Sequence, residues 1–185
     1  MPVVTVTLLP GYGTECESRL VQRLALATRS VIAAQAAGTT VFVQHAATYL
    51  RDNRVFTGGG AELPDASARV RQFLEAMQAR DLDLARSFLA PGFVMTFPGS
   101  APMSELTQVI EWAQGRYQKV SKRYERFEEC WGDGVTTVYC SGTLQGVWPD
   151  GSAFEGIRFI DRFEVEAGQL RRQDVWNDLA ELRPR

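Results

Sequence analysis

Hydrophobic residues follow two periods in the part of the chain beyond residue 65. Val70, Phe73, Leu74 and Met77 recur at helical spacing, whereas apolar and polar residues alternate from about Lys122 onward, as in half-buried strands. These patterns predict helices over 66–80, up to 89 and from 104, with a strand over 93–97 and four long strands over 122–131, 135–148, 154–166 and 169–178. We expect Pro91-Gly92 to stop the second helix.

Three helices followed by a meander of four long strands indicate an α+β fold. The sheet has to curl over the helices in order to bury one face of each strand. A curled, mostly antiparallel sheet of this kind forms a cone with an open mouth, and such cavities readily bind small molecules.

The first 57 residues have a different pattern. We expect a strand over 3–9, a helix that starts at a capping box of Thr14 and Glu17 and ends at Gly38, and a second strand over 39–46. The two strands of such a βαβ unit normally run parallel. A short hairpin over 49–57 follows.

A glycine-rich segment, 58–64, marks a boundary between two domains, 1–60 and 61–185. A unit of about 57 residues with two main strands has too little core to be stable alone. We therefore expect the first domain to pair with a copy of itself or to pack against the second domain.

Two carboxylates on apolar faces are candidates for acid–base chemistry. Asp161 alternates with the apolar residues of strand 154–166, and Asp174 shares a face with Leu170 and Trp176, because side chains two apart in a strand point the same way. Burial raises the pKa of a carboxyl toward neutrality, where general acid–base catalysis is most efficient. In the alternative interpretation, Asp161 pairs with an arginine across the sheet and Asp174 ends the ladder or caps a loop.

Composition narrows the classes of partner. The 185-residue chain is 45% hydrophobic and 23% charged and has a net charge of −2. Without a basic block, nothing suggests nucleic acid or a membrane as a partner. The scattered Cys16, Cys130 and Cys140, with the single His45, form no recognisable zinc set. We expect a cytoplasmic protein that needs no metal or other cofactor.

The first domain resembles the 4-oxalocrotonate tautomerase family. A proline follows the initiator, and a strand, a helix, a strand and a hairpin with a phenylalanine before glycines come next. The resemblance implies that Pro2, once Met1 is removed, is the general base and that Phe56 lines the pocket. Tyr12 and Phe42 stand where family members usually carry arginines, and we expect them to contact the substrate.

Other readings of the first domain stay open. Arg51 and Arg54 on the hairpin are alternative partners for a substrate carboxylate. If Met1 is retained, Pro2 is an amide nitrogen without basicity, and the domain mainly drives assembly. A dehalogenase or hydratase is a third possibility that the resemblance implies.

Residues 65–182, with the closing stretch RQDVWND from Arg172 to Asp178, resemble the nuclear transport factor 2-like superfamily, especially the SnoaL-type polyketide cyclases. In those cyclases an acid on the final strand is the general acid/base of an aldol closure, and that position matches Asp174. Among the aromatic residues, Tyr117, Tyr139 and Trp176 are expected to line the substrate pocket.

We therefore predict a cofactor-independent acid–base enzyme that isomerises or cyclises a small enolisable carbonyl compound. Asp174 exchanges the proton, Asp161 is the second acid or tunes Asp174, and Pro2 is an independent base. The alternative is a non-catalytic module that binds a hydrophobic ligand or drives oligomerisation. Either function favours a homo-oligomer.

Overall fold

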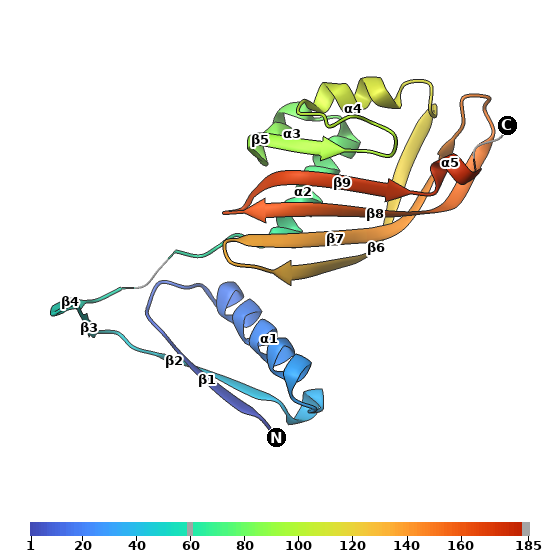
Figure 1. Ribbon diagram of the computed structural model, residues 1–185. Helices are drawn as coiled ribbons and strands as arrows, with labels where there is room; N and C mark the ends of the chain where they lie inside the picture. Colours follow the sequence, from blue (N-terminus) through green and yellow to red (C-terminus); the bar gives the residue numbers. More distant parts are fainter. Residues whose placement is uncertain (59–60, 183–185) are drawn as a thin grey trace. The chain divides into compact units, whose positions relative to one another are not determined.

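The computed structural model describes residues 1–58 and 61–182, and the chain divides into two compact units (Figure 1). We call Met1–Glu62 unit 1 and Leu63–Arg185 unit 2. No helix within the described residues is long and apolar enough to cross a membrane.

Unit 1 is a βαβ unit followed by a hairpin. Its elements are β1 (Val3–Leu8), α1 (Thr14–Val31), the 3-10 turn η1 (Ala36–Gly38), β2 (Thr40–His45), β3 (Tyr49–Arg51) and β4 (Arg54–Phe56). β1 and β2 pair in parallel, as the βαβ pattern predicts. Asp52 and Asn53 both have positive φ, which is the backbone of a tight hairpin turn between β3 and β4.

The start and end of α1 differ from the sequence prediction. Gly13, not Thr14, is the N-cap residue, and the helix ends at Val31 rather than at Gly38. The predicted capping box is absent because the N-cap, Gly13, has no side chain. The carboxylate of Glu17 pairs with His45 instead, with Nε2 2.6 Å from Oε1.

Unit 2 consists of helices packed against one curved sheet. Its helices are α2 (Ala66–Ala79), α3 (Leu82–Ser87), α4 (Leu106–Ala113) and α5 (Leu179–Leu182). Its strands are β5 (Leu89–Thr96), β6 (Lys119–Trp131), β7 (Val135–Val147), β8 (Ala153–Glu166) and β9 (Gln169–Asn177), in the sheet order β5-β9-β8-β7-β6. α2, α3 and α4 lie on one side of this sheet (Figure 1).

The core of unit 2 lies between the helices and the inner face of the sheet. Every second residue of β8 from Ile157 to Val165 is buried, as the alternation predicts. α2 contributes Phe73, whose ring meets the rings of Phe93 and Phe163 edge-on at centroid distances of 6.3 and 6.0 Å. The fold is thus α+β with a curved sheet, as expected from the sequence.

One strand begins earlier than predicted. β5 starts at Leu89 and pairs in parallel with β9, with a break in register between Leu89 and Val94. Pro91-Gly92 therefore lies in an irregular stretch of an edge strand instead of ending a helix. Proline is tolerated there because an edge strand does not need every N–H for its ladder.

β9 contains the irregularity with the greatest consequence for the site. Val165 pairs with Leu170 and Glu164 pairs with Arg172, so Arg171 is one extra residue in β9. A one-residue slip moves every following side chain to the opposite face. Leu170 faces the core, but beyond the bulge the inner face continues with Gln173 and Val175. The prediction that Asp174 shares the face of Leu170 is therefore wrong.

Candidate functional site

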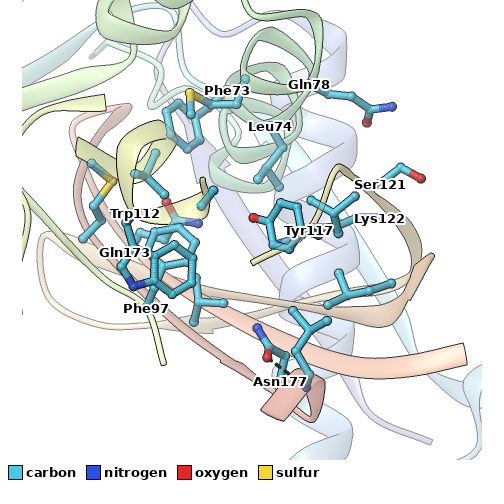
Figure 2. Close-up of a pocket in the computed structure, with 18 of the residues that line it drawn as sticks. Phe73, Leu74, Gln78, Phe97, Trp112, Tyr117, Ser121, Lys122, Gln173 and Asn177 are labelled. Carbon is cyan, nitrogen blue, oxygen red and sulfur yellow. Dashed lines mark hydrogen bonds between the residues drawn. The ribbon is translucent and has the colours of Figure 1, made fainter. Parts of the chain in front are cut away.

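A cavity of about 190 Å³ opens in unit 2 between the helices and the inner face of the sheet. Figure 2 shows Phe73 and Leu74 on one side of it, Phe97, Trp112 and Gln173 on a second, and Tyr117, Ser121 and Lys122 on a third. Most of the lining is apolar or aromatic. The polar members are Gln78, Arg80, Tyr117, Ser121, Lys122, Tyr124, Gln173 and Asn177. No aspartate, glutamate or histidine lines the cavity among the described residues.

Asp161 is the buried carboxylate nearest to this cavity. It lies on the inner face of β8 between Phe159 and Phe163, and none of its surface is exposed. Its Oδ2 accepts a hydrogen bond from Nζ of Lys122. Its Oδ1 has no hydrogen-bond partner among the described residues. Asp161 therefore does not line the cavity itself, and one of its two oxygens has no hydrogen-bond partner among the described residues.

Lys122 connects Asp161 to the cavity. It lies on β6, keeps 21% of its side chain exposed, and holds its ammonium 4.5 Å from the centre of the Phe159 ring. β6 carries an extra residue between Tyr124 and Arg126, and its backbone approaches Gly142 of β7 closely. A Cβ at Gly142 would stand 2.0 Å from the carbonyl oxygen of Arg123, so only glycine permits this approach.

Burial controls the protonation of this region. It raises the pKa of Asp161, and this effect outweighs the opposing effects of the Lys122 ammonium and of the Gln173 amide. Gln173 acts at close range without reaching hydrogen-bond geometry at Oδ1. Burial, with the nearby Asp161, also raises the pKa of the Cys140 thiol to about 12 and raises the pKa of Tyr124. Cys140 and Tyr124 therefore stay protonated and neutral at neutral pH.

Asp174 lies on the outer face of the sheet, away from the cavity. Nε of Arg172 donates to both of its oxygens, at 3.0 and 2.8 Å, and Nη1 of Arg162 donates to Oδ2 at 3.2 Å. Arg162 also bonds Glu164 at 2.6 Å. The sequence analysis left an arginine partner open for Asp161, but in the structure the arginines pair with Asp174, and Asp161 pairs with Lys122.

The three aromatic residues predicted to line the pocket separate in the structure. Tyr117 lines the cavity, and burial raises the pKa of its hydroxyl. Tyr139 and Trp176 lie on the outer face of β7 and β9, with 36% and 53% of their surface exposed. Neither lines the cavity, so their predicted placement is wrong.

The SnoaL-like domain family matches residues 70–173, more than half of the chain. The chain belongs to this family. A search of curated proteins found no match.

Solved structures share the fold of the SnoaL-like unit at low sequence identity. An NTF2-like protein of unknown function from Burkholderia pseudomallei is 19% identical with a TM-score of 0.53, over 65% of this chain and 95% of that one. TerC, co-crystallised with polyporic acid, is 13% identical with a TM-score of 0.52, over 63% and 93%. A putative polyketide cyclase from Xanthomonas campestris is 19% identical with a TM-score of 0.50, over 63% and 92%.

The SnoaL-like match leaves unit 1 outside its bounds, and the residues predicted there remain expectations. Pro2 precedes β1, and its carbonyl accepts a hydrogen bond from the Thr40 N–H at 3.1 Å. Tyr12 is half-buried and Phe42 is 54% exposed. Phe56 is 40% exposed and stacks on Tyr49 at 5.2 Å.

Sequence reasoning missed two residues of the SnoaL-like cavity. Lys122 alternates with Val120 and Tyr124, so a single cation on a half-apolar face was a visible signal. Gln173 had no comparable signal, because the bulge at Arg171 decides its direction and leaves no clear mark in the sequence.

Proposed function

We propose that unit 2 is a cofactor-independent acid–base enzyme that isomerises or cyclises a small enolisable carbonyl compound. The SnoaL-like and NTF2-like families include polyketide cyclases and ketosteroid isomerases, and this gives the class of reaction. The observation that carries the proposal is the Lys122–Asp161 pair, in which a fully buried carboxyl is bonded to an amine that lines an apolar cavity.

The pair can hold a proton in two places. With Lys122 charged and Asp161 ionised, two opposite charges stand in apolar surroundings, which is costly. Transfer of the proton from Nζ to Asp161 makes both groups neutral, and the burial that raises the pKa of Asp161 acts in this direction. In this proposal the neutral pair is the reactive form, because an amine accepts a proton and an ammonium does not.

A reaction follows in which atoms and charges balance. The neutral amine of Lys122 removes a proton from the carbon next to the substrate carbonyl, and the electron pair moves onto the carbonyl oxygen as an enolate. The ammonium so formed is held by Asp161 and returns the proton to another carbon, which completes an isomerisation. In a cyclisation the enolate carbon attacks a second carbonyl, and the ammonium protonates the resulting alkoxide.

This assignment moves the proton exchange from Asp174 to Lys122 and Asp161. Asp161 keeps the role of partner that the sequence analysis gave it, now toward an amine. Asp174 is excluded from the step because its carboxylate is held by two arginines on the opposite face of the sheet.

Deuterium exchange tests the proposal without knowledge of the natural substrate. Nuclear magnetic resonance in D₂O follows exchange at the α-carbons of 2-tetralone and 1-phenyl-1,3-butanedione. Native protein should accelerate exchange, and Lys122→Met should lower the acceleration by about 10²–10⁴-fold. Lys122→Met/Asp161→Asn, which leaves no unpaired buried charge, should stay inactive while folding like the native chain.

Asp174→Asn is the matched control and should keep the native exchange rate, because the residue does not reach the cavity. Full exchange by folded Lys122→Met would overturn the mechanism. Binding of the probes by native protein without any exchange would favour the alternative, a ligand-binding module. One observation favours a ligand-binding module, because no carboxylate lines the cavity among the described residues.

A tautomerase centre at Pro2 is a second proposal, and it is independent of the first. The parallel βαβ arrangement of unit 1, with Pro2 directly before β1, supports it. A free α-amine titrates at about 8, close to working pH. Intact mass of the native protein tests this proposal: loss of Met1 leaves Pro2 with a free secondary amine, and retention of Met1 rules out the mechanism.

A further inference from the structure

Positive charge without an acidic counterpart surrounds the entrance of the cavity. Of the residues that line the cavity, only Gln78 and Arg80 are exposed, so the entrance lies at the end of α2. Arg80 forms no ion pair among the described residues, and its neighbour Asp81 caps α3 by accepting from the Leu84 N–H at 3.0 Å. The guanidinium of Arg80 is thus available to a ligand.

A second guanidinium lies against a lining residue of the same cavity. Arg116 stacks on Trp112, a lining residue, with its guanidinium carbon 4.0 Å from the ring centre. It too forms no ion pair within the described part of the chain. Arg80 lines the cavity and Arg116 stacks on a residue that lines it, so two guanidinium groups that form no ion pair among the described residues lie at the cavity wall. Both also lower the pKa of the Tyr117 hydroxyl, against the larger effect of burial.

The backbone at Arg80 supports a role beyond packing. Arg80 ends α2 in the left-handed region, with φ of 61°. Glycine or asparagine is usual at this position because a side chain adds strain. An arginine kept in such a conformation is consistent with a functional position, where strain of this kind is often found.

We infer that the ligand is an oxo acid, with an apolar body in the cavity, the α-carbon of its carbonyl at Lys122 and a carboxylate that Arg80 and Arg116 bind. Only the carbonyl group of the ligand rests on the proposed function. The carboxylate follows from the two unpaired guanidinium groups, which bind carboxylates in charge-assisted hydrogen bonds. The cavity is smaller than the ~300–1,000 Å³ of pockets for drug-sized ligands, so the acid is small, with one or two rings.

A matched pair of probes tests the inference. 4-Oxo-4-phenylbutanoate carries the carboxylate, and 4-oxo-4-phenylbutanamide has the same shape without the charge. Isothermal titration calorimetry at low salt should show that native protein binds the acid at least about tenfold more tightly than the amide. The preference should shrink as salt is added, because exposed guanidinium groups are screened.

Variants show which residues cause the preference for the acid over the amide. Arg80→Gln/Arg116→Gln should bind acid and amide about equally, whereas Arg86→Gln should keep the native preference. Arg86 is an exposed arginine of α3 that pairs with Asp83 at 2.7 Å and does not line the cavity. Equal binding of the two probes by native protein, failure to bind either one, or an unchanged preference in the double variant would overturn the inference.

The outcomes separate this inference from the proposed function. A preference for the acid that depends on Arg80 and Arg116 supports the anion site even if α-carbon exchange proves independent of Lys122. Conversely, exchange that requires Lys122, together with equal binding of acid and amide, supports the proposed function and overturns the oxo acid.

Discussion

The two units differ in what they bury. In unit 1, none of the described residues is buried, and Val3, Leu26, Phe42 and Val55 each expose more than half of their surface. In unit 2, a continuous core of aromatic and aliphatic side chains fills the space between the helices and the sheet. Burial of apolar surface is the main source of stability, so unit 2 gains much more stabilisation from its own core than unit 1 does.

The contrast shows where a protein can place costly groups. Unit 2 holds a fully buried carboxyl, that of Asp161, whose partner Lys122 lines the cavity. A large core supplies the free energy that offsets such groups. Unit 1 has no such core within its own described residues, and its association with another unit or copy stays a prediction.

The largest expected effect contrasts one phenylalanine in each unit. Phe163 is fully buried in unit 2, and Phe163→Ala should lower the free energy of unfolding by about 3–5 kcal/mol. Phe42→Ala in unit 1 should change it by about 0.5 kcal/mol or less, because the ring is more than half exposed. Urea unfolding followed by circular dichroism gives both values. Similar losses for the two variants would show that Phe42 is covered in solution.

The second prediction concerns the buried pair. Lys122→Met removes the partner of Asp161 and should destabilise unit 2 by about 3–5 kcal/mol near pH 8. The deficit should shrink toward pH 4. The Lys122 ammonium lowers the pKa of Asp161 against the larger effect of burial, so its loss raises that pKa further. Between the native and the variant pKa the folded variant binds a proton that the folded native protein does not, so the deficit grows as pH rises through this window and is smaller below it.

Asp161→Asn in the same background is the control. The double variant Lys122→Met/Asp161→Asn should recover most of the lost stability and lose the pH dependence of the deficit, as measured by urea titrations at several pH values. A deficit in Lys122→Met that does not change with pH would mean that the protonation of Asp161 is not its cause.

The smallest expected effect has the opposite sign. Arg80→Gly relieves a side chain from the left-handed end of α2 and should raise the free energy of unfolding by about 0.5–1 kcal/mol. Arg116→Gly is the matched comparison, because residue 116 lacks the positive φ and glycine there should not stabilise. Thermal melts distinguish the two. A loss of stability in Arg80→Gly would show that its side chain supports the fold rather than a ligand.

The secondary structure of unit 2 followed from sequence where a period runs unbroken. The residues on the inner face of β8 could be predicted because five alternate residues from Ile157 to Val165 all point to the same face of the sheet. Of the two acids predicted for the site, only one was placed on the correct face. Asp161 was placed correctly on the inner face, whereas the direction of Asp174 depends on Arg171, an extra residue that the pattern does not reveal.

The sequence by itself determined the α+β class, the division into a small βαβ unit and a larger unit of helices and long strands, and the inward direction of Asp161, because these depend on local period and composition. The tertiary structure alone decided which polar groups meet. Lys122 reaches Asp161 from two strands away, and Arg80 lines the same cavity as Trp112, on which Arg116 stacks. Such contacts depend on bulges and strand order, which a local pattern of hydrophobic and polar residues does not encode.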